Sequence, residues 1–349
     1  MARRAISPLT RAYQRNLKAL TKATLGSSKR IATQVQRAAA KQLKPPPGRG
    51  DWLPGVALGP AGARRYHLYR PPDLQLKLGE KLPLVVMLHG CGQTGRDFAI
   101  STRMNRIAAR EGFMVLYPEQ DRIANAQGCW NWYDRRSGKA DAEAATLMAA
   151  VDQVLMLYPL DRDRVALAGL SAGASMAALL ATRYPLRFKA VAMHSGVAPG
   201  AARSPATALG AMRGQHGPPM LATAVGKAMG AAAVFTTLPP LLVLHGDADT
   251  VVSASNASST AAVWAVATGA RAGAVRTVQR GKRHPMRITD FTRRGRIAVS
   301  LCEIAGLGHA WSGGAPSMLF TDAAGPDASK LVWAFAARQF RLSARQHAL

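Results

Sequence analysis

Five short apolar runs recur along the chain, each containing or closed by glycine or proline. Such nearly continuous runs predict strands that are covered on both faces. Longer runs with helical spacing lie between them, at 141–158 and 173–184. Strands that alternate with helices predict an α/β fold with a mostly parallel central sheet and helices on both faces. The predicted strands are "LPLVVMLHG" (82–90), "FMVLYP" (113–118), "RVALAGL" (164–170), "AVAMHSG" (190–196) and "PPLLVLHG" (239–246).

The pattern after residue 198 is less regular. Residues 199–237 are rich in Ala, Gly, Pro and Met, and they fit either a lid-like insertion or an ordinary helical crossover with loops. Residues 287–304 predict a hairpin that turns at Arg294-Gly295. Residues 327–340 predict a closing amphipathic helix.

The first 44 residues form a different region. Apolar residues at helical spacing (Leu9, Tyr13, Leu17, Leu20) fit an amphipathic helix, and "KPPPGRG" (44–50) ends any helix. The alternative is a disordered basic tail. We therefore expect a basic N-terminal segment and linker at 1–50, and one folded domain at 51–349.

The charge of the chain bears on its binding partners and not on its fold. The 349 residues include 46 Lys and Arg against 19 Asp and Glu, a net charge of +27. Residues 1–50 hold twelve basic residues and no acid, and a second basic stretch covers 271–296. Such charge predicts attraction to anionic surfaces, so we expect residues 1–44 to favour an anionic granule or membrane surface. No specific nucleic acid is expected.

The sequence "GLSAG" (169–173) lies between a predicted strand and a predicted helix. This context turns the weak G-x-S-x-G signal into a nucleophile prediction, because the strained turn would lift the Ser171 hydroxyl above the sheet edge. The alternative is a turn of small residues.

Charges that recur through Lys44 leave no apolar core of a signal peptide, and no apolar run is long enough to cross a bilayer.

A serine nucleophile needs a base and an orienting acid, which in an α/β-hydrolase follow it in the order acid, then histidine. His309 in "GLGHAWSGG" is the predicted base, preferred over His284 and His347. Asp249 in "LHGDADTVV" is the predicted acid, with Asp247 as the alternative.

Two backbone N–H groups should bind the oxyanion. We expect them from Ala172, directly after the serine, and from Cys91 in "LHGCGQTG". Trp130 and Trp132 in "GCWNWYDRRSG" fit either a substrate cleft or a local hydrophobic core, and Trp311 is expected to touch substrate. No metal or other cofactor is expected.

These motifs, in this order, resemble the esterase family that contains polyhydroxybutyrate (PHB) depolymerase catalytic domains and some feruloyl and acetylxylan esterases. The resemblance covers roughly 66–340 and implies an α/β-hydrolase fold, the triad Ser171, Asp249 and His309, and oxyanion donors at Cys91 and Ala172. It also implies a disulfide between Cys91 and Cys129. A disulfide favours secretion, whereas the missing signal peptide favours a cytoplasmic or granule-associated enzyme, so the compartment stays open.

The expected activity is therefore that of a serine carboxylesterase, most simply one that acts on short-chain polyhydroxyalkanoate or its oligomers. A feruloyl or acetylxylan esterase is the alternative within the family. A basic granule- or nucleic-acid-binding protein on a hydrolase scaffold is the alternative from another class. The oligomeric state is not predicted.

Overall fold

The computed structural model describes residues 44–215 and 238–347. The predicted N-terminal segment 1–44 lies outside the described residues except for Lys44, and so does the 216–237 part of the predicted lid. The chain divides into two units, residues 1–45 and 46–349, and every helix and strand that the structure describes belongs to the second.

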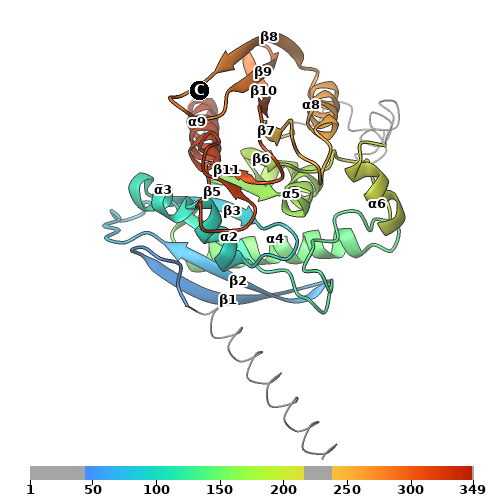
Figure 1. Ribbon diagram of the computed structural model, residues 1–349. Helices are drawn as coiled ribbons and strands as arrows, with labels where there is room; N and C mark the ends of the chain where they lie inside the picture. The colour runs from blue at the N-terminus through green and yellow to red at the C-terminus, as the bar shows by residue number, and fades with distance from the viewer. Residues whose placement is uncertain (1–43, 216–237, 348–349) are drawn as a thin grey trace, which may run out of the picture. The chain divides into compact units, whose positions relative to one another are not determined.

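The described elements alternate between strands and helices through the middle of the chain (Figure 1). The strands are β1 (Asp51–Gly59), β2 (Gly62–Arg70), β3 (Leu82–Leu88), β4 (Met114–Pro118), β5 (Leu160–Leu170), β6 (Ala190–His194), β7 (Leu241–Gly246), β8 (Arg271–Val278), β9 (Met286–Arg293), β10 (Arg296–Ile304), β11 (Trp311–Ser312) and β12 (Thr321–Asp322). The helices are α2 (Gly95–Thr102), α3 (Met104–Glu111), α4 (Lys139–Leu157), α5 (Ala172–Arg183), the 3₁₀ turn η1 (Pro185–Arg187), α6 (Pro205–Met212), α8 (Ser255–Thr268) and α9 (Ala328–His347).

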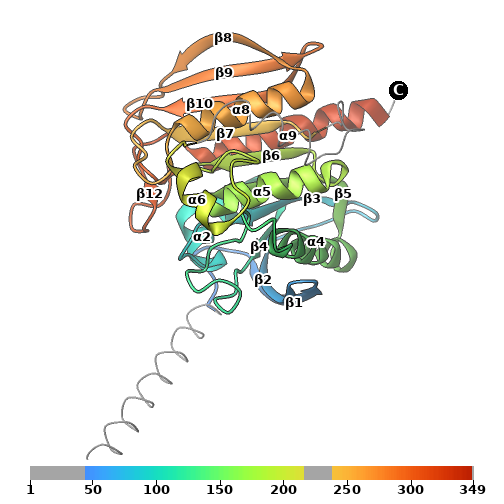
Figure 2. The same cartoon turned by 90° about the vertical axis from the view of Figure 1, so that its right-hand side faces the viewer.

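Ten strands form one sheet in the order β1-β2-β4-β3-β5-β6-β7-β10-β9-β8. The six strands from β4 to β10 in this order are parallel, and antiparallel pairs extend the sheet at both ends. Figure 2 shows the strands stacked from β1 at the bottom to β8 at the top. The predicted mostly parallel sheet is therefore confirmed.

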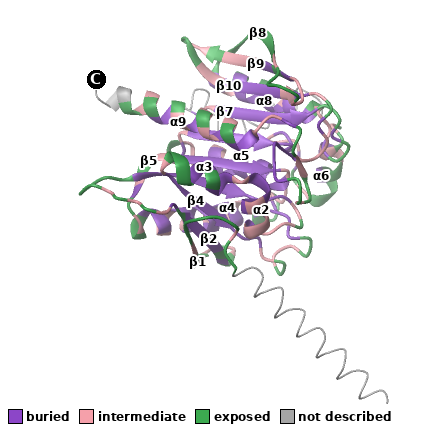
Figure 3. Cartoon of the chain, turned by 60° about the vertical axis from the view of Figure 1, so that its left-hand side comes forward, coloured by how far each residue is buried: buried purple, intermediate pink, exposed green. Residues whose placement is uncertain are grey.

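Each central strand packs on both faces, which explains its continuous apolar run. In β3, Leu84 and Val86 enter one core and Val85 and Met87 enter the other. Helices α4, α5 and α8 cover the first face, and α2, α3 and α9 cover the second (Figure 1). Figure 3 shows this burial along the inner strands and the loss of it at β8, which is exposed over nearly its whole length.

The hairpin predicted at 287–304 is present as β9 and β10. Its turn residues Arg294 and Gly295 have φ of 49° and 71°, the left-handed pair that matches the twist of a tight hairpin. Across residues 44–215 and 238–347, every helix is too short or too polar to span a lipid bilayer.

Parallel strands send all their carboxyl ends to one edge of the sheet, which we call the carboxyl edge. The loops after β3, β5, β7 and β10 meet there, and they carry the predicted oxyanion, nucleophile, acid and base positions in that order. Ligand sites of open α/β sheets lie at this edge.

Candidate active site

Ser171 occupies a strained turn between β5 and α5. Its backbone has φ 56° and ψ −122°, and its N–H donates to the His194 carbonyl at 2.9 Å. The flanking glycines are required by close packing: a Cβ on Gly173 would lie 2.1 Å from the Leu88 carbonyl oxygen, and one on Gly169 would lie 2.3 Å from that of Gly173. The turn therefore presents Ser171 at the carboxyl edge, as the sequence predicts.

Asp249 and His309 meet at the same edge, although 60 residues separate them. His309 Nδ1 donates to Asp249 Oδ2 at 2.7 Å. Because a carboxylate only accepts, this bond places the imidazole proton on Nδ1 and leaves Nε2 as the basic nitrogen. The pair can thus hold a histidine base in the tautomer that proton abstraction needs.

The Asp249 carboxylate is held on both oxygens. Oδ1 accepts from the N–H groups of Val251 and Val252, at 2.9 and 2.8 Å. Burial acts to raise the pKa of this carboxyl, but hydrogen bonds from His245 and His309 outweigh burial and hold the pKa well below its usual range. Asp249 is therefore ionised throughout the neutral range.

His245 is a neighbour of this site that the sequence did not reveal. Its Nε2 lies 2.9 Å from the Val252 carbonyl oxygen and 3.3 Å from Asp249 Oδ2. The carbonyl requires a proton on Nε2, so one N–H faces both oxygens. The imidazole is buried, and its Nδ1 has no hydrogen-bond partner among the described residues. The signal in the sequence was a histidine ending a buried strand, four residues before the acid.

His194 supports β11, the short strand that follows the predicted base His309. Its Nε2 accepts from the Ser312 N–H at 3.1 Å, directly after the His309 loop. Burial, together with the nearby His245 and His309, lowers the pKa of His194 to about 3. A permanently neutral imidazole therefore accepts this bond, and it holds β11 in place without adding charge to the site.

The predicted oxyanion loop after β3 is anchored by His89. The ring accepts from the Gln120 N–H at 3.1 Å, and its other nitrogen donates to the Gly90 carbonyl at 2.8 Å. Burial lowers the pKa of His89, so this bonding describes a neutral ring. Its role is structural.

The loop after β4 closes over the oxyanion loop. Cys91 and Cys129 form a disulfide, and the Gly92 N–H donates to the Gln127 carbonyl at 3.0 Å. Buried Glu143 on α4 holds the far side, because it accepts from both the backbone and the side-chain N–H groups of Asn131 at 2.8 Å. One covalent and one charged anchor thus fix a wall of the site.

A cavity of about 550 Å³, which we call the catalytic cavity, opens at these loops. Ser171, His309, Cys91 and Ala172 all line it. Ala172 is the first residue of α5, where N–H groups have no partner within the helix. The other walls are mainly apolar: Trp132, Tyr133, Leu170, Val197, Pro205, Ala208, Leu209, Met212, Val251, Val252 and Phe320. The cavity therefore suits an uncharged, partly apolar substrate.

Two of the three predicted substrate-binding tryptophans are corrected by the structure. Trp132 lines the catalytic cavity, but Trp130 and Trp311 are fully buried and do not. Trp130 Nε1 donates to the His89 carbonyl, and Trp311 Nε1 donates to Ser329 Oγ. Both rings fill the core beneath the site. The density of aromatic residues around Trp130, and the position of Trp311 two residues after His309, did not distinguish core from cleft.

The alternatives for the acid and the base have other partners. Asp247 accepts from the Gly306 N–H at 2.7 Å, and His284 Nε2 lies 3.1 Å from a carboxylate oxygen of Asp322. Neither Asp247 nor His284 lines the catalytic cavity. The base and the acid predicted from chain order are therefore the pair that meets at the carboxyl edge.

Helix α6 belongs to the segment for which the sequence left a lid or a crossover open. It contributes Ala208, Leu209 and Met212 to the wall of the catalytic cavity. The described part of this segment therefore borders the site, whichever of the two forms the whole segment takes.

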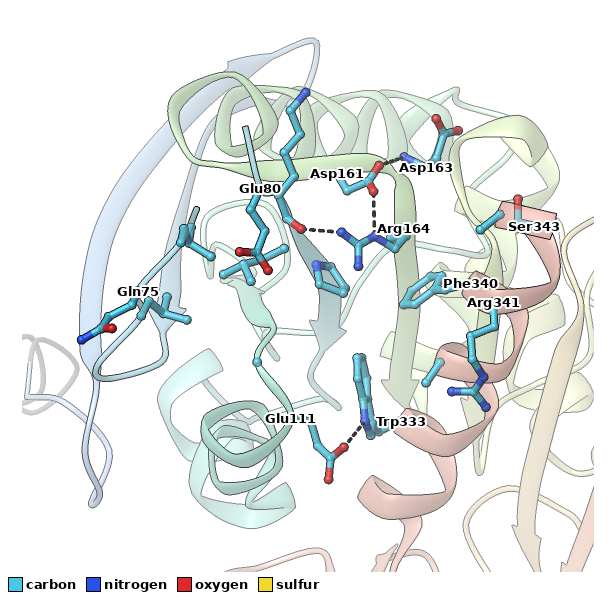
Figure 4. A pocket seen from close by; sticks show the side chains of 18 residues that line it. Gln75, Glu80, Glu111, Asp161, Asp163, Arg164, Trp333, Phe340, Arg341 and Ser343 are labelled. Atoms are coloured by element: carbon cyan, nitrogen blue, oxygen red, sulfur yellow. Dashed lines mark hydrogen bonds and ion pairs between the residues drawn. The ribbon is translucent and has the colours of Figure 1, made fainter. Parts of the chain in front are cut away.

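A larger cavity, of about 670 Å³, lies at the opposite edge of the sheet (Figure 4). Two pairs of its polar groups interact: Arg164 binds Asp161, and Trp333 Nε1 donates to Glu111. The described residues that line it include no histidine or cysteine. Within the described ranges no cluster of three His, Cys, Asp or Glu residues could hold a metal ion.

The sequence model of the family described as "Esterase PHB depolymerase" matches residues 64–280. This span contains Ser171 and Asp249 and ends before His309. The chain is 35% identical over 124 residues to feruloyl esterase B of Neurospora crassa, which covers 35% of this chain and 41% of that protein. It is 28% identical over 198 residues to poly(3-hydroxyalkanoate) depolymerase C of Paucimonas lemoignei. That alignment covers 51% of this chain and 43% of the relative. Each of these two matches spans less than half of the relative's length.

Among solved structures, the acetyl xylan esterase from Aspergillus awamori has a TM-score of 0.62 at 21% identity, covering 75% of this chain and 94% of that one. At this identity the likeness concerns the fold, and it agrees with the mostly parallel sheet described above.

Proposed function

The chain belongs to the PHB depolymerase esterase family, and from this premise we propose that it is a serine carboxylesterase that hydrolyses esters through an acyl-enzyme. The observation that carries the proposal is the convergence of Ser171, the Asp249–His309 pair and a partly apolar cavity at one sheet edge. The family spans several ester classes, so the chemistry of this cavity has to select among them.

In the proposed reaction Ser171 Oγ attacks the ester carbonyl carbon while His309 Nε2 takes the hydroxyl proton. The C–O bond to the alcohol then breaks, and His309 returns the proton to the leaving oxygen. Water, activated by the same nitrogen, hydrolyses the acyl-enzyme and releases the acid. Asp249 stays ionised and stabilises the imidazolium that forms at each step.

The negative charge that develops on the carbonyl oxygen needs fixed donors. The N–H groups of Cys91 and Ala172 are the proposed pair, because both residues line the cavity beside Ser171. The disulfide would fix the Cys91 N–H in place before the substrate binds. The positive end of the α5 dipole at Ala172 would favour the negative charge on the oxyanion.

The proposed substrate is a short-chain hydroxyalkanoate polyester or its oligomers. Support comes from the uncharged apolar walls and from the resemblance to a poly(3-hydroxyalkanoate) depolymerase. A feruloyl ester is the second candidate, since Trp132 and Tyr133 offer aromatic faces to a phenolic acyl group and a feruloyl esterase is a relative.

The deciding experiment compares purified protein on hydroxybutyrate oligomers, methyl ferulate and acetylated xylan, each with Ser171→Ala as a control. The polyester assignment predicts the highest kcat/KM for the oligomers, and loss of the nucleophile should lower kcat by about 10⁴-fold or more. Higher activity on methyl ferulate would transfer the assignment to that class. Activity that survives in Ser171→Ala would refute the serine mechanism.

A further inference from the structure

A second cleft on the carboxyl edge remains unexplained by this reaction. It has a volume of about 390 Å³, an apolar floor and a basic rim, and we call it the basic cleft. The floor consists of Val278, Met286, Ile288 and Leu331. The rim carries four basic side chains and one acid: Arg276, Arg280, Arg283, Lys330 and Asp327. His284 and Pro326 complete the lining.

Strand register places the basic cleft on the same edge as the catalytic cavity. β10 is parallel to β7 and ends with Ile304 opposite Gly246. Met286 pairs with Ile304, and Val278 pairs with Met286, so the turn at 279–285 follows the same edge. Figure 1 shows β8 and β9 beyond β10 at one end of the sheet.

One segment of chain forms a wall of both cavities. Phe320 lines the catalytic cavity, and Pro326 lines the basic cleft. Pro326 follows Phe320 by six residues, so their Cα atoms lie at most about 22 Å apart. The turn is fastened to this segment, because the His284 N–H donates to the Ala324 carbonyl at 3.0 Å and Arg283 Nη1 donates to the carbonyls of residues 323 and 325.

Two positive charges in the rim have no acidic partner among the described residues. Arg276 pairs with Asp290, and Lys330 lies 3.8 Å from Asp327. Arg280 and Arg283 form no ion pair with any residue that the structure describes, and Arg283 is bonded only to neutral carbonyls there. Residues 271–296 contain nine basic side chains and one acid. The cleft therefore attracts an anion while its floor attracts apolar groups.

We propose that the basic cleft binds the terminal carboxylate of an oligoester whose ester group lies in the catalytic cavity. This inference rests on the proposed function and names its substrate class: a hydroxyacid oligomer with a free acid end. Such a chain carries alkyl groups for the floor and one anionic end for Arg280 and Arg283. Feruloyl and acetyl groups on neutral sugars offer no such anion.

The experiment measures kcat/KM of the full chain on hydroxybutyrate oligomers from dimer to hexamer, each as the free acid and as the methyl ester. Exposed charge pairs are worth at most about 1 kcal/mol, so the free acid should be preferred about fivefold once the oligomer is long enough to reach the cleft. The preference should fall in 1 M salt, where the screening length is about 3 Å. Arg280→Gln should reduce it to about twofold or less, and Arg280→Glu should reverse it.

The matched control is Arg271→Gln, which removes an exposed arginine from β8 at the other end of the strand. It should leave the acid preference as in the wild type. An equal loss in Arg271→Gln, or equal kcat/KM for acid and methyl ester at every length, overturns the inference while ester hydrolysis stands. A preference found instead for acetylated xylan bearing uronic acid assigns the cleft to that carboxylate and overturns the polyester assignment. Failure to hydrolyse any ester rejects the proposed function itself.

Discussion

Two imidazoles converge on one oxygen of Asp249. His309 donates to Oδ2 at 2.7 Å, and the N–H of His245 faces the same oxygen at 3.3 Å. A second donor draws charge from the carboxylate, which then stabilises a protonated His309 less strongly. His245 is therefore expected to act as a positioning residue that also tunes the base.

Replacing His245 separates these effects. His245→Leu removes the N–H that positions the Asp249 carboxylate, and this loss of positioning should lower kcat about tenfold or more, which corresponds to about 1.4 kcal/mol. Without the donor the carboxylate holds the imidazolium more strongly, and the acidic limb of kcat/KM should move to higher pH. His245→Gln retains an N–H near the position of Nε2 and should keep the wild-type limb. A pH profile that is the same in all three proteins would contradict the assigned role.

At the scale of elements, the β5–α5 elbow depends on two glycines that touch backbone. Gly173 packs against the carbonyls of Leu88 and His89, neither of which can move without disturbing β3. Gly173→Ala should destabilise the fold by about 3 kcal/mol and lower turnover with it, measured by urea unfolding and kinetics. Gly210→Ala in α6 is the control, because among the described residues its Cβ would meet only the Gln215 side chain, at 3.4 Å.

The disulfide links the loops after β3 and β4, which carry one proposed oxyanion donor and Trp132. It closes a span of 38 residues, for which chain entropy predicts about 4 kcal/mol of stabilisation. The variant with Cys91→Ser and Cys129→Ser should unfold at lower urea concentration and lose turnover through a looser oxyanion loop. A reducing agent should reproduce both effects in the wild type only. The third cysteine, Cys302, should not respond to the reducing agent, because burial raises the pKa of its thiol to about 12 and keeps it unreactive. Full activity under reduction would show that the bond is dispensable.

At the scale of the whole molecule, the charge is concentrated outside the catalytic machinery. Residues 1–50 hold twelve basic residues and no acid, and so supply +12 of the +27. We expect deletion of residues 1–48 to abolish binding to phosphatidylglycerol vesicles and to polyester granules with an anionic coat, and to spare hydrolysis of soluble esters. Phosphatidylcholine vesicles and 1 M salt are the controls. Unchanged co-sedimentation of the shortened chain would assign surface binding to the remaining basic residues.

The chain's apolar runs were sufficient to predict the parallel core, because a strand buried on both faces has to be apolar at every position. Ser171 was predicted as the nucleophile for a similar local reason: its flanking glycines mark the turn of one strand–turn–helix unit. Asp249 and His309 followed from chain order and from loops that end strands. All of these depend on short stretches of sequence.

The tertiary structure decided whatever depends on contacts between distant segments. It buried Trp130 and Trp311 and left Trp132 in the wall of the catalytic cavity. All three residues are tryptophans, so only their packing in the folded chain distinguishes them. It brought His245 to Asp249 through the turn that follows β7. It also placed the 279–285 turn beside the active-site edge, because strand order, which no local pattern encodes, sets which loops become neighbours.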